Sequence, residues 1–167
     1  DRHRSIRAVF NSSWNRLNET EQQLFARLSI FRGTFGREAA EKIAHARLQT
    51  LANLVGKSLL QYDGINKRYQ VHELLRQYGA EQLAAKPEEE YDTMRCFSTF
   101  YCKEAERHIQ LLVDGQVQAS MDRFELDATN IRLAWDWAVS QENIALMNEA
   151  VTGLCTYLDW SWRVEDA

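Results

Sequence analysis

A change of hydrophobic period at residues 58–71 constrains the fold of this chain more than any other feature of its sequence. Residues 58–62 and 68–71 are short strand-like runs, and the five residues between them, which include Gly64 and Asn66, favour a turn. This pattern predicts a β-hairpin. On both sides of it, apolar residues recur at offsets of three and four, which predicts helices. The helices expected in this half of the chain lie at about 5–17, 20–32, 37–46, 48–57 and 72–85.

The second of these helices carries its own start and stop signals. Thr20, with Gln23 three residues later, predicts a capping box at its beginning. Gly33 and Gly36 predict that it ends in a turn around Phe35.

Three helices followed by a β-hairpin is the element order of a winged helix, in which the hairpin forms the wing. One further helix precedes the three-helix core and another follows the hairpin. We therefore predict a mainly α fold that begins with a winged-helix domain at 1–86.

The remainder of the chain, 87–167, predicts helices alone. The segment 86–90 holds the only Pro and an acidic run, and the chain changes there from net basic to net acidic, which suggests two units. Apolar stripes predict antiparallel helices joined by short turns, as at the start of an α-solenoid. These helices are expected at about 97–112, 124–138 and 144–157, with turns at 114–115 and 141–143.

The composition of the chain indicates the cellular compartment in which it is expected. Three cysteines, Cys96, Cys102 and Cys155, give an odd count without a disulfide framework, so we expect buried thiols in a reducing compartment. No signal peptide and no apolar run of about 18 residues is present. We expect a cytoplasmic protein that does not enter a membrane. Because the sequence starts at Asp1 and stops within a helical pattern, we also expect it to be part of a longer polypeptide.

Catalytic and cofactor motifs are absent from the sequence. Gly56-Lys57-Ser58 resembles the end of a phosphate-binding loop, but Leu51 stands where that loop needs Gly, and the order of strand and helix is reversed. The four histidines do not adjoin a nucleophile, and no metalloprotease motif occurs. We therefore expect no enzyme activity, and no metal or cofactor bound by these residues alone.

The winged-helix order also allows direct DNA binding, with 48–57 as the recognition helix. Gln49, Asn53 and Lys57 would then face the bases, and Arg47, Lys67 and Arg68 would contact phosphates. This set is sparse for a protein that neutralises several phosphates. We therefore favour the alternative that the basic surface faces another domain.

His72 is the residue most suited to contact an anion, because it stands at the expected start of the helix after the hairpin. There an imidazolium can donate a charge-assisted hydrogen bond to an anion lying against the wing. The alternative is a role as a helix cap or as a half-buried packing residue.

The stretch RYQVHELLRQYGAEQL, at 68–83, resembles the end of the winged helix in signal-transducing ATPases with numerous domains. Three further blocks, 5–17, 21–35 and 51–60, resemble the same family in the same order. The run at 125–137, with Trp135 and Trp137, is similar to the first helices of the tetratricopeptide-like array in its bacterial branch. That branch includes transcriptional regulators of the antibiotic-regulator and LuxR types.

The resemblance implies a nucleotide-dependent switch. In this family, a nucleotide-binding domain precedes the winged helix, and a histidine in a Met-His-Asp-like triplet contacts the diphosphate of ADP and holds the protein closed. Val71-His72-Glu73 occupies the triplet, with Val and Glu in place of Met and Asp. His72 is thereby implied to be the nucleotide sensor.

The same resemblance implies the partners. ADP or ATP would bind elsewhere in the parent protein, whose nucleotide-binding domain would contact the winged helix. An inducer or a protein partner would bind the tetratricopeptide-like segment at 87–167. The expected function is an autoinhibitory, nucleotide-sensing module of a transcriptional regulator. The alternatives are a DNA-binding winged helix and a passive interaction scaffold.

Overall fold

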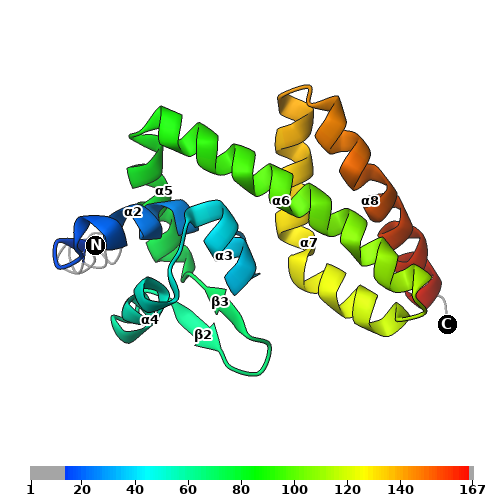
Figure 1. The fold of residues 1–167 in the computed structure, drawn as a ribbon, viewed down its shortest axis with the longest axis horizontal. Helices are drawn as coiled ribbons and strands as arrows, with labels where there is room; N and C mark the ends of the chain where they lie inside the picture. The colour runs from blue at the N-terminus through cyan, green and yellow to red at the C-terminus, as the bar shows by residue number, and fades with distance from the viewer. Residues whose placement is uncertain (1–13, 166–167) are drawn as a thin grey trace. The chain divides into compact units, whose positions relative to one another are not determined.

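The structure of the chain, a computed structural model, describes residues 14–165, without the side chains of 110, 113 and 160–165 (Figure 1). It is mainly helical, as predicted, and divides into two compact units. Of the described residues, the first unit contains those up to Phe31 together with Gly36–Thr93. The second contains Arg32–Phe35 and the described residues from Met94 onward. The predicted helix at 5–17 falls almost entirely outside the described residues.

The first unit has the winged-helix order that the sequence predicts. Its helices are α2 (Glu19–Leu28), α3 (Arg37–Ala44), α4 (Leu48–Gly56) and α5 (Glu73–Ala84). α2 packs against the other three, so it lies at the centre of this unit. The largest fully buried side chains that α2, α3 and α4 contribute are Phe25, Leu28, Ile43, Leu51 and Leu54.

The start of α2 corrects the prediction of a cap at Thr20. Asn18 is the N-cap: its Oδ1 accepts a hydrogen bond from the Glu21 amide at 2.9 Å, and the Glu21 carboxylate accepts one from the Asn18 amide at 3.0 Å. The capping box therefore uses Asn18 and Glu21, because Asn satisfies the first helical amides as well as Thr does. α2 ends at Leu28, before Gly33, with Ser29 as its C-cap.

The predicted hairpin is present as β2 (Gln61–Asp63) and β3 (Arg68–Gln70), which pair antiparallel with Tyr62 opposite Tyr69. The expected strand at 58–62 starts three residues late. Ser58 has a left-handed backbone with φ 57°, and the amides of the next two residues bond the Leu54 carbonyl, so this segment wraps the end of α4.

A third strand, β1 (Thr34–Gly36), lies where only a turn was expected. The sheet has the order β1-β3-β2. β2 and β3 are equally short, but the turn between them signals a hairpin, whereas β1 pairs with a strand that is distant in the sequence and has no such local signal.

The second unit is helical, as predicted. It contains the later part of α6 (Pro87–Val113) together with α7 (Val117–Ser140) and α8 (Ile144–Glu165). α7 and α8 run antiparallel, joined by the predicted turn at 141–143 (Figure 1). The fully buried side chains of this unit include Phe97, Tyr101, Ala105, Ile131, Ala134 and Ala150. α6 begins at Pro87, and the compact units separate after Thr93. The domain boundary between 86 and 87 stays a prediction.

No helix among the described residues has the length and hydrophobicity that crossing a membrane requires. In the same part of the chain, no cluster of three or more His, Cys, Asp and Glu side chains is arranged to bind a metal ion.

Candidate functional site: the start of α5 and the polar face of α4

His72 is the N-cap residue of α5, directly after the wing. Its backbone is extended, with φ −61° and ψ 136°, and its carbonyl accepts the first helical hydrogen bond, from the Arg76 amide, at 2.9 Å. The imidazole makes no capping hydrogen bond to the helix, and the residue is exposed. The side chain therefore acts neither as a cap nor as a packing group. It stands at the end of α5 where the helix dipole is positive, which favours an anion.

The residues on either side of His72 have structural partners. Val71 is buried. The Glu73 carboxylate accepts two hydrogen bonds from the Arg76 guanidinium, both at 2.7 Å, and one from the side-chain amide of Gln77 at 3.1 Å. Arg76 also donates to the Ser29 carbonyl at 3.3 Å, which ties α5 to the end of α2. Of the Val71-His72-Glu73 triplet, His72 alone is exposed without such a bond to its own helix.

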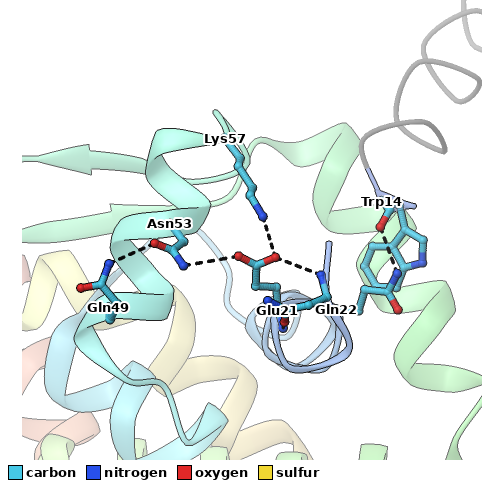
Figure 2. Close-up of polar contacts among 7 residues, drawn as sticks. Trp14, Glu21, Gln22, Gln49, Asn53 and Lys57 are labelled. Carbon is cyan, nitrogen blue, oxygen red and sulfur yellow. Dashed lines mark hydrogen bonds and ion pairs between the residues drawn. The ribbon is translucent and has the colours of Figure 1, made fainter. Parts of the chain in front are cut away.

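The polar face of α4 converges on a buried carboxylate. Figure 2 shows Glu21 of α2 between Asn53 and Lys57. The Lys57 ammonium lies 2.6 Å from one carboxylate oxygen of Glu21, and the side-chain amide of Asn53 donates to the other carboxylate oxygen at 3.5 Å. Gln49 in turn donates to the Asn53 side chain at 3.1 Å. The side chain of Glu21 is 3% exposed, whereas that of Lys57 is 40% exposed.

The electrostatics of this group keep Glu21 charged. The hydrogen bond from Lys57 is the largest cause that lowers the pKa of the Glu21 carboxyl below its ordinary value of 4.5. Desolvation acts in the opposite direction, and the Asn18 amide, the charge of Lys57 and the Asn53 side chain add to the lowering. The result is an ionised carboxylate inside the winged helix, held by donors from α4.

Three of the six side chains expected on a DNA-binding surface therefore bond to one another or to Glu21, although all three residues are exposed. Gln49 and Asn53 of α4 form a chain of hydrogen bonds that ends on Glu21, and Lys57, the C-cap residue of α4, bonds the same carboxylate (Figure 2). Arg47 is the exposed N-cap residue of α4. Lys67 is exposed at the end of the wing turn, and Arg68 is half-buried at the start of β3. Of the six residues, the structure brings together only Gln49, Asn53 and Lys57, beside Glu21.

Sequence reasoning missed the residues that position this site. Glu21 could have been found, because Asn18 and Glu21 have capping-box spacing. Its pairing with Lys57, 36 residues away, has no signal in a single sequence. The same holds for Arg76, whose guanidinium reaches Ser29 across 47 residues.

The expectation of buried thiols is confirmed for Cys102, where burial raises the pKa of the thiol to about 11. It is wrong for Cys155, which is exposed, and Cys96 is intermediate.

Comparison with known proteins gives similarity to transcriptional regulators. No family model matches the chain. Proteins from Mycobacterium bovis and Mycobacterium tuberculosis, provisionally named HTH-type transcriptional regulators, are 32% identical over 151 residues. That match includes 85% of this chain, but the chain spans only 17% of the length of these relatives.

Among solved structures, the chain is similar to a protein from Pyrococcus horikoshii. That protein is described as a Signal Transduction ATPase with Numerous Domains (STAND) protein with a tetratricopeptide repeat sensor. The match has 16% identity and a TM-score of 0.43, and covers 89% of this chain and 27% of the other. By its match to the mycobacterial proteins, the chain is similar to part of much larger proteins named as transcriptional regulators.

Proposed function

We propose that this chain is a non-catalytic regulatory segment of an ATP-dependent transcriptional regulator. Its winged helix senses the nucleotide bound by an ATPase domain of the same protein and holds that domain inactive. The observation that carries the proposal is the position of His72, exposed at the N-cap of α5 with its imidazole unused by the helix. The similarity to large regulators supports the same function.

The chemistry of His72 fits the diphosphate of ADP. A protonated imidazole at the positive end of a helix donates to phosphate oxygens, and a charge-assisted hydrogen bond contributes about 1.5–3 kcal/mol. If the contact exists only in the closed, ADP-bound state, its energy shifts the balance between closed and open states. A difference of about 1.4 kcal/mol changes that balance tenfold.

The network around Glu21 favours this function over direct DNA binding. A base-reading helix must present free donors and acceptors to the groove. On α4, Gln49 and Asn53 bond one another, and Lys57 neutralises Glu21. Turning Lys57 toward a phosphate would remove the main partner of a buried carboxylate, which is costly. The polar face of α4 therefore stabilises the winged helix itself.

The second unit has a separate role in this proposal. The helices of 87–167 form the start of a tetratricopeptide-like array, which receives an inducer or a protein partner. Binding there would release the winged helix from the nucleotide-binding domain. A passive scaffold would use the same helices without any link to the nucleotide.

The test compares ADP retention by the full-length protein with and without His72. We expect His72→Ala to lose ADP markedly faster than wild type and to form oligomers without inducer. His45→Asn is a matched control, because His45 is exposed in the same unit and has a left-handed backbone, with φ 56°, that Asn tolerates. Wild-type retention in His72→Ala would contradict the sensor role and favour the scaffold.

A further inference from the structure

Arg76 holds the carboxylate of Glu73, the residue that follows His72 at the start of α5. The Nε and Nη2 atoms of Arg76 donate to the two carboxylate oxygens, each at 2.7 Å. The side-chain amide of Gln77 adds a third hydrogen bond at 3.1 Å. These donors stand three and four residues after Glu73. The carboxylate is therefore drawn along α5, away from the residue that precedes the helix.

Arg76 is itself fixed by the body of the winged helix. Its side chain is 11% exposed, and its Nη1 donates to the Ser29 carbonyl at the end of α2, at 3.3 Å. Three residues later α5 lies so close to α2 that a Cβ added at Gly79 would be 2.9 Å from the Ser29 Cβ. The rigid fork of a guanidinium can bind the Ser29 carbonyl and both Glu73 oxygens at once. Arg76 is therefore held where it meets Glu73.

The charge of Glu73 opposes an anion at this end of α5. A carboxylate in the first turn interacts favourably with the positive end of the helix dipole, so it competes with any anion that binds there. Glu73 and Arg76 form a bidentate ion pair, which places one positive charge against this negative charge. Because the pair is neutral as a whole, the first turn of α5 does not repel an anion that contacts His72.

We propose that Arg76 is a positioning residue for the nucleotide contact of His72. It draws back and neutralises the Glu73 carboxylate, which keeps the start of α5 favourable to the diphosphate of ADP. This role rests on the proposed function, because it concerns the same site. It predicts that the affinity for ADP follows the net charge of the pair formed by Glu73 and Arg76.

The test is the affinity of the full-length protein for ADP in a double-mutant cycle of this pair. Arg76→Gln leaves the Glu73 charge unopposed, and we expect ADP to bind about two- to fivefold more weakly, the effect of one charge at a helix terminus. Glu73→Gln leaves the Arg76 charge unopposed, so ADP should bind more tightly by a similar factor. The double variant has a neutral pair again, and its affinity should return to that of wild type. If Arg76 served only to pack α5 against Ser29, removing the Glu73 charge would restore nothing.

Lys42→Gln is the matched control. Lys42 forms an ion pair with Glu38 at 2.8 Å on α3 of the same unit, and both side chains are more than half exposed. Its loss changes the net charge of the protein by the same amount as Arg76→Gln, without altering the pair on α5. We expect the affinity of Lys42→Gln for ADP to equal that of wild type.

Two results of the cycle would overturn the proposal: no loss of ADP affinity in Arg76→Gln, or a double variant that binds ADP as weakly as Arg76→Gln. If Arg76→Gln does not fold, Glu73→Gln alone is compared with wild type, and unchanged or weaker ADP binding contradicts the role of the pair. His72→Ala is measured alongside. Wild-type affinity for ADP in that variant contradicts the sensor role of His72, whereas the cycle by itself decides the role of Arg76.

Discussion

At the scale of single residues, the buried carboxylate of Glu21 makes the winged helix sensitive to acid. Lys57 is the main cause that holds the folded-state pKa below the ordinary value of 4.5. A lowered carboxyl pKa stabilises the folded state at pH values above 4.5, and this contribution is lost as the pH falls from 4.5 through the folded-state pKa. The change in the free energy of unfolding at acid pH therefore reports on the ion pair between Glu21 and Lys57.

We predict that Lys57→Met lowers the free energy of unfolding by about 1–2 kcal/mol at neutral pH. The expected loss is modest because solvent reaches Lys57 and weakens its attraction to Glu21. The deficit should shrink as the pH falls below 4.5, because a protonated Glu21 no longer needs a cation. Urea unfolding at neutral and acid pH measures both. Lys42→Met is the control, since it removes an exposed ion pair with Glu38 at 2.8 Å. A deficit in Lys57→Met that stays constant with pH would argue against the ion pair.

At the scale of elements, the close contact between α6 and α8 depends on Gly153. A Cβ added at Gly153 of α8 would overlap the backbone carbonyl of Ala105 on α6. A carbonyl within a helix cannot turn away as a flexible side chain can, so α8 would have to shift.

We predict that Gly153→Ala destabilises the chain by about 1–3 kcal/mol, the typical cost of overpacking. The matched control is Gly56→Ala at the end of α4, where an added Cβ meets nothing within 4 Å. That change should be neutral or slightly stabilising, because Ala restricts the unfolded chain. Urea unfolding followed by helical circular dichroism compares the two. Equal stability of both variants would mean that α6 and α8 do not depend on this close approach.

The elements show what one sequence can and cannot predict. Apolar periodicity located the described helices from α2 to α8. The hairpin was located by its turn residues, because β2 is exposed along its whole length. Sequence reasoning missed β1, which is not joined to its partner strand by a hairpin turn, and it placed the start of β2 too early because the turn at Ser58 was unrecognised. The local part of the site, His72 at the start of α5, could be predicted. The pairs Glu21–Lys57 and Ser29–Arg76 join distant residues, so only the fold brings them together.

At the scale of the whole molecule, the regulatory function and the DNA-binding alternative give different results for the same chain. Because Lys57 at the end of α4 pairs with Glu21, we predict that the 167-residue chain does not bind duplex DNA at physiological salt. Fluorescence anisotropy with labelled duplexes over a range of salt concentrations measures this. Binding that weakens steeply with salt would indicate several phosphate contacts and would support the DNA-binding alternative.

The central claim is that the winged helix distinguishes nucleotides through His72. The most direct test is the affinity of the full-length protein for ADP and for a non-hydrolysable ATP analogue, in wild type and in His72→Ala. Only a contact specific to the closed state can shift the equilibrium. We predict that His72→Ala weakens ADP binding about tenfold, equivalent to ~1.4 kcal/mol, and leaves the affinity for the analogue unchanged. An equal loss for both nucleotides, or no loss for either, would contradict the claim.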